Sequence, residues 1–95
     1  MRARRVVKVP GGKLLKLTVE IQGGVLTEFS LRGDFFAHPE EGFDRVEASM
    51  EGVPAADFST AFREALEREG VELYGISADD ASAAYEEVYR DIASA

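Results

Sequence analysis

Residues 14–33 read LLKLTVEIQGGVLTEFSLRG, and this stretch decides the fold. In its first half apolar and polar residues alternate, a period of two that predicts a strand with one buried face. The apolar positions of this strand are Leu15, Leu17, Val19 and Ile21. Gln22-Gly23-Gly24 then provides the positive φ angles that a tight hairpin requires. The alternation of the next strand, over 25–33, runs through Val25, Thr27, Phe29 and Leu31.

A further strand precedes this hairpin. Residues 4–9 form an extended segment rich in valine, and Pro10-Gly11-Gly12 ends it with turn chemistry. The first third of the chain therefore predicts an antiparallel sheet of about three strands with one apolar face.

Beyond Asp34 the apolar period becomes helical. Pro39 suits the first position of a helix that His38 would cap, and this helix is expected to run to about Met50. A second helix is expected over about 58–69, with Gly70 as its stop. Residues 71–76 then form a short extended connection to a last helix. Its signals are a capping-box-like pair and a regular apolar stripe: Ser77, Asp80, Ala81, Ala84, Tyr85, Val88, Tyr89 and Ile92.

Three amphipathic helices need an apolar surface, and a single sheet offers one. The expected fold class is α+β, a small antiparallel sheet of about three strands with three helices packed on one face. At 95 residues the chain is expected to be a single domain, 1–95, with a core so small that a partner surface would add noticeably to its stability.

The composition excludes several classes of protein. The chain has no cysteine, which removes disulfides, thiol nucleophiles and thiolate metal sites, and it has no apolar run long enough for a membrane span or a signal peptide. We therefore expect a cytoplasmic protein with no membrane contact.

The charge is unevenly distributed. The net charge is −7, yet residues 1–33 carry seven Lys/Arg against two acids. An acidic chain of this kind is not expected to bind nucleic acid. The basic first third is either a solvated hairpin or a surface for phosphates or an acidic partner.

Few residues suggest chemistry. Gly11-Gly12-Lys13 invites a phosphate-loop interpretation, but a strand rather than a helix follows Lys13, so a plain turn is the simpler interpretation. His38 is the only histidine, and no nucleophile or carboxylate metal cluster accompanies it, so we predict no catalytic residue and no metal site. Phe35 and Phe36 are adjacent in an extended segment and should point to opposite sides, one into the core and one available to a partner; burial of both is the alternative.

Three segments in order carry a resemblance: KVPGGKLL at 8–15, the hairpin VEIQGGVL at 19–26, and LRGDFFAHPEE at 31–41. Together they resemble the carboxy-terminal domain of lipoate-protein ligases, in particular the separate small subunit of two-part, archaeal-type ligases. The resemblance covers roughly residues 5–52 and implies a SufE/NifU-like fold, here without the cysteines of the iron-sulfur proteins of that type.

The resemblance implies a non-catalytic accessory subunit. A separate catalytic subunit would bind lipoate and ATP-Mg, form lipoyl-AMP and pass the lipoyl group to lysines of lipoyl carrier domains, while this chain binds no cofactor alone. The similar segments make a set of residues the candidates for the interface with the partner or its ligand: Gly11, Gly12, Lys13, Gly33, Asp34, Phe35 and Phe36. The alternative is a general protein-protein interaction module on the same fold, with no role in lipoylation. A stand-alone enzyme is a third hypothesis.

Overall fold

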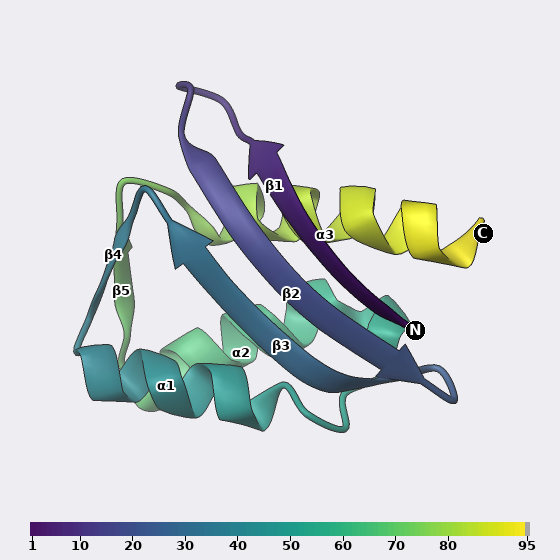
Figure 1. Cartoon of the computed structure of the whole chain (residues 1–95). Helices are drawn as coiled ribbons and strands as arrows, with labels where there is room; N and C mark the ends of the chain where they lie inside the picture. The colour runs from purple at the N-terminus through teal and green to yellow at the C-terminus, as the bar shows by residue number, and fades with distance from the viewer. Residues whose placement is uncertain (95) are drawn as a thin grey trace.

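The computed structural model describes residues 1–94 (Figure 1). Three strands come first, and helices alternate with two short strands after them. The elements are β1 (Arg2–Lys8), β2 (Leu14–Gln22), β3 (Val25–Gly33), β4 (Phe36–His38), α1 (Glu40–Ser49), a short 3-10 helix η1 (Ala55–Asp57), α2 (Phe58–Glu69), β5 (Glu72–Tyr74) and α3 (Ala78–Ala93). The predicted α+β class is confirmed.

The main sheet is antiparallel in the order β1-β2-β3. Its central strand behaves as the alternation predicts, because Leu15, Leu17 and Val19 are buried while Lys16 on the other face is exposed. Figure 1 shows the helices lying on one side of this sheet and leaving its other face uncovered. The three-helix, one-face arrangement is therefore confirmed.

The alternation of β3 differs from the expectation. Phe29 and Leu31 are buried as predicted, but Leu26 is buried in place of its neighbours Val25 and Thr27. The cause is a bulge, because Glu20 pairs with Glu28 whereas the next residue, Ile21, pairs with Leu26. One extra residue on β3 reverses which side chains face the core.

Helix α2 has the ends that the sequence predicts, and helix α3 has the predicted start. Helix α2 has the predicted bounds and ends at Gly70 in the left-handed conformation, with φ 64°. Helix α3 starts with a complete capping box between Ser77 and Asp80. In the core between helices and sheet, Phe58 stacks on Tyr85 with ring centroids 4.0 Å apart. No helix within residues 1–94 combines the length and the apolar character needed to cross a membrane.

The start of α1 corrects the prediction. Pro39 has an extended ψ of 149° and occupies the N-cap, so the helix begins one residue later, at Glu40. His38 is not a cap, because it belongs to β4 and pairs with Glu72 of β5 in a second, two-stranded sheet. The short connection expected over 71–76 thus forms a strand that pairs with a segment more than thirty residues earlier.

Candidate functional site

Gly33 and Asp34 hold the end of β3 against the start of β2. A Cβ atom on Gly33 would lie 2.2 Å from the carbonyl oxygen of Leu14, so only glycine allows this approach. The backbone N–H of Asp34 donates to the same oxygen at 3.0 Å. Its carboxylate Oδ2 accepts from the N–H of Leu14 at 2.8 Å. Gly33 and Asp34 therefore stabilise the contact between the end of β3 and the start of β2.

Gly11, Gly12 and Lys13 form the turn between β1 and β2. Val9 and Lys13 are joined by a backbone hydrogen bond of 2.9 Å, and both glycines have positive φ angles, 90° and 81°. The plain-turn interpretation is thus correct for the backbone. The Lys13 side chain extends from the turn toward Gly75, where its Nζ lies 3.8 Å from the position that a Cβ atom would take. Within residues 1–94 this ammonium has no carboxylate partner.

The structure brings most of the candidates together in one shallow depression of about 560 Å³. Its lining consists of Gly11, Lys13, Gly33, Asp34, Phe35 and Phe36. Gly12 is on the same turn but outside the lining, on the side of Lys8. The sequence segments that carry the candidates, 11–13 and 33–36, are thus neighbours in space because β2 and β3 pair.

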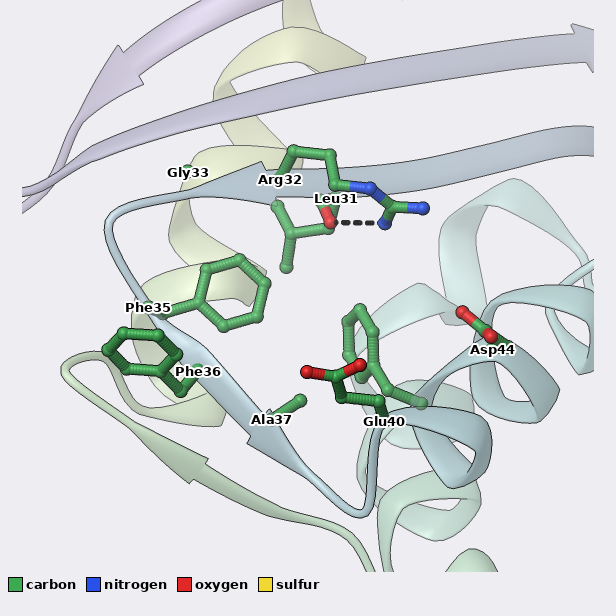
Figure 2. Close-up of a pocket in the computed structure, with 9 residues that line it drawn as sticks. Leu31, Arg32, Gly33, Phe35, Phe36, Ala37, Glu40 and Asp44 are labelled. Carbon is green, nitrogen blue, oxygen red and sulfur yellow. Dashed lines mark hydrogen bonds between the residues drawn. The ribbon is translucent and has the colours of Figure 1, made fainter.

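Phe35 and Phe36 divide as the extended segment predicts. Phe35 packs edge-to-face on Phe43 of α1, with centroids 5.7 Å apart. Phe36 is 78% exposed. Figure 2 shows the two rings extending to opposite sides of the chain, Phe35 toward Leu31.

Tyr74 is a member of this surface that the sequence did not indicate. It pairs directly with Phe36 across the β4–β5 sheet and is 50% exposed. Its hydroxyl donates to Glu72, and this hydrogen bond raises the pKa of the tyrosine. The only sequence signal is an aromatic residue in a short extended segment, which cannot show the pairing. We call Lys13, Phe36 and Tyr74 the aromatic edge.

A second hollow, of about 320 Å³, adjoins the aromatic edge between β3, β4 and α1. Figure 2 shows its lining, in which Leu31 and Phe35 form an apolar floor and Glu40 and Asp44 stand on the helical side. Arg32 lies on the opposite wall and donates to the carbonyl oxygen of Leu31 at 2.8 Å. An apolar floor with charged walls suits a contact with another molecule.

The described residues form no recognisable catalytic constellation. Within 1–94, no three His, Cys, Asp or Glu side chains are grouped closely enough to hold a metal ion. Burial raises the pKa of Tyr85, but this residue belongs to the core and its hydroxyl donates to the carbonyl of Ala55. The geometry offers a surface with exposed aromatic side chains and, within residues 1–94, an ammonium that has no carboxylate partner.

Comparisons with known proteins give one informative result. No family model and no curated protein sequence matches the chain. Among solved structures, one chain is similar to it with a TM-score of 0.76 and 24% sequence identity, over 90% of this chain and 94% of that one. It comes from a structure described as an archaeal lipoylation system, a bipartite lipoate protein ligase and its E2 lipoyl domain, from Thermoplasma acidophilum. The two chains therefore share a fold over nearly their whole lengths.

Proposed function

We propose that this chain is a non-catalytic accessory subunit of a bipartite lipoate-protein ligase. In this proposal a separate catalytic subunit needs the chain in order to activate lipoate with ATP to lipoyl-AMP. The lipoyl group then passes to lysines of lipoyl carrier domains, which are indirect partners of this chain in the cytoplasm.

The observation that carries the proposal is the full-length likeness to a chain of a bipartite lipoylation system. The match extends over 90% of this chain and 94% of that chain. The resemblance of segments 8–15, 19–26 and 31–41 to the ligase accessory domain points the same way and rests on different information.

The aromatic edge is the proposed contact with the catalytic subunit. Exposed aromatic side chains contribute a large share of the binding energy in protein interfaces, and Phe36 and Tyr74 stand side by side on a two-stranded sheet. Lys13 lines the same depression as Phe36, its Nζ lies 3.8 Å from the position a Cβ atom on Gly75 would take, and it has no carboxylate partner within residues 1–94. It is therefore free to meet a negative group at the interface.

Lipoate and ATP-Mg bind to the catalytic subunit in this proposal, and no catalytic group comes from this chain. Its contribution is to close the partner's site against water and to place positive charge near the phosphates. Lys13 is the residue assigned to the charge, and Phe36 is assigned to the closure.

The test is lipoate-dependent pyrophosphate release by the candidate catalytic subunit, measured with and without this chain and without any carrier domain. Release that requires the mixture supports the proposal. A competent catalytic subunit that is indifferent to the chain contradicts it and favours the general interaction module. Release by this chain alone contradicts it in favour of an enzyme.

A further inference from the structure

The two edge strands of the main sheet, β3 and β1, differ in whether their outward backbone groups are hydrogen-bonded. Two outward N–H groups of β3 are already hydrogen-bonded: that of Leu31 donates to the Glu47 carboxylate at 2.8 Å, and that of Leu26 donates to the carbonyl of Val53 at 2.8 Å. A further bridge joins Val25 to Pro54. These contacts occupy both ends of the β3 edge.

The other edge, β1, is open. The ladder with β2 uses the odd-numbered residues, because Met1 exchanges hydrogen bonds with Ile21 and Val9 binds Lys13 at its two ends. The backbone groups of Arg4, Val6 and Lys8 therefore point away from the sheet. Within residues 1–94 these outward backbone groups accept one hydrogen bond, which the side chain of Arg5 donates to the carbonyl oxygen of Arg4.

The surface beside this edge is basic. The uncovered face of the sheet has a shallow hollow whose lining includes four cationic residues and no acid: Arg4, Arg5, Val6, Lys16, Leu17, Thr18, Ser30 and Arg32. By register Arg5 shares the opposite face with Leu17, and its guanidinium donates to the outward carbonyl of Arg4. The acids of the uncovered face are at the far end, where Glu28 binds Arg2 and Glu20 binds Thr27. Val6, in the middle of the edge, is 61% exposed.

The other face of an added strand would lie above α3, the helix that packs against β1. In Figure 1 this helix passes behind β1 and continues beyond it. Its later turns carry Tyr89 and Ile92, apolar side chains that are only partly buried against the core. A strand beside β1 would therefore meet Tyr89 and Ile92, with Arg5 at the edge, on one side and the cations Arg4 and Lys16 on the other.

We propose that an extended segment of the catalytic partner adds to β1 as a fourth strand, with acidic side chains toward Arg4 and Lys16 and apolar ones toward α3. Alternation of the two faces follows from the period of a strand. A second copy of β1 fits poorly, because it would bring Arg2, Arg4 and Arg5 against their own equivalents. This inference rests on the proposed function and assigns the partner a second contact, separate from the aromatic edge.

Amide hydrogen exchange, followed by NMR in the free chain and in its complex with the catalytic subunit, tests the inference directly. The amides of Arg4, Val6 and Lys8 should exchange rapidly in the free chain and slow by at least about tenfold in the complex. Arg5 and Val7 are the internal reference, because their amides already pair with β2 in the free chain.

Two variants at the middle of the edge provide a second measurement. Val6→Pro removes an outward N–H without removing a bond to β2, and it should weaken the complex at least about fivefold. Val6→Ala keeps the N–H and should bind within about twofold of the parent. Circular dichroism establishes that both fold. If Val6→Pro does not fold, the exchange measurement on the unaltered chain decides alone.

A charge pair tests the chemistry of the occupant. Arg4→Glu combined with Lys16→Glu should weaken the complex about tenfold in low salt, with the loss shrinking as salt is added. Arg68→Glu, at an exposed position of α2, is the control for a single charge reversal away from the sheet and should change little.

The outcomes separate this inference from the proposed function. Stimulated pyrophosphate release with no added protection at Arg4, Val6 and Lys8 overturns the added strand and leaves the accessory role standing. A chain that neither binds the catalytic subunit nor stimulates it overturns both. Protection that appears in the free chain as its concentration rises overturns the inference in favour of pairing between two copies.

Discussion

The carboxylate of Glu47 on α1 accepts a hydrogen bond from the backbone N–H of Leu31 on β3, with Oε2 and N 2.8 Å apart. The same oxygen accepts from the guanidinium of Arg32 at 2.7 Å. A buried side chain of a helix thus satisfies an outward backbone donor that no strand covers. This contact ties the helical layer to the edge of the sheet.

Glu47→Ala should lower the free energy of unfolding by about 1–3 kcal/mol, because it leaves the buried N–H of Leu31 without an acceptor. Glu47→Gln keeps an oxygen at this place and should cost less. Arg32→Ala should change stability by at most about 1 kcal/mol, since the arginine is largely exposed. Urea unfolding followed by circular dichroism measures all three. Equal losses for the Ala and Gln variants would show that charge, not the acceptor, matters.

The parts of the fold that the sequence predicts well are those whose signals are local. The Ser77–Asp80 capping box and Gly70 fix the helix ends they mark, because these contacts span only a few residues. The bulge at Thr27 was not predictable from alternation, since it depends on how β3 meets β2. The β4–β5 pair was missed because strands of three residues have too few positions to show a period.

Gly33→Ala should destabilise the protein by about 2–3 kcal/mol, because a Cβ atom would collide with the carbonyl oxygen of Leu14 at a residue with φ 141°. Gly11→Ala is the control: it also has a positive φ angle, but open space surrounds it, so its cost should be about 1 kcal/mol. Thermal unfolding of both variants checks the difference. A similar loss for both would mean that the close approach to Leu14 relaxes at little cost.

Asp34→Ala should lower the free energy of unfolding by about 1 kcal/mol, since it removes the acceptor for the N–H of Leu14. Asp34→Asn retains a side-chain oxygen and should be closer to the parent. The pair therefore separates structure from function in the pyrophosphate assay. If Asp34→Asn is stable and yet fails to stimulate the catalytic subunit, the carboxylate itself acts at the interface.

The candidate site shows the same division between local and distant information. The sequence predicts segments 11–13 and 33–36 as candidates, and the β2–β3 pairing places them on one surface. The exposure of Phe36 follows from its adjacency to Phe35 in an extended segment. Tyr74 and the unpaired edge of β1 depend on tertiary pairing, and no spacing in the sequence indicates either of them.

Phe36→Ala and Lys13→Ala should each reduce stimulation of pyrophosphate release about tenfold at limiting chain concentration, because each removes an interaction with the catalytic subunit. Phe36 is largely exposed and Lys13 forms no ion pair within residues 1–94, so unfolding free energies should stay within about 0.5 kcal/mol of the parent. Arg68→Ala removes an exposed cation of α2 that does not line the depression and is the control. Full stimulation by both variants would place the contact elsewhere on the molecule.

Tyr85 links stability to alkaline pH. Burial raises the pKa of its phenol, and its hydroxyl donates to the carbonyl of Ala55 at 2.7 Å. Tyr85→Phe should therefore lower the free energy of unfolding by about 1 kcal/mol near neutral pH, where the phenol is protonated in both the folded and the unfolded state.

The effect of Tyr85→Phe should depend on pH. Above pH about 10 the Tyr85 phenol ionises in the unfolded chain before it ionises in the folded protein, which lowers the stability of the parent. The Tyr85→Phe variant has no phenol at this position, so it does not undergo this loss. The stability gap between the two proteins should shrink as the pH rises from 9 to about 11, measured by urea unfolding at each pH. A gap that stays constant over this range would mean that the Tyr85 phenol ionises in the folded protein as readily as in the unfolded chain.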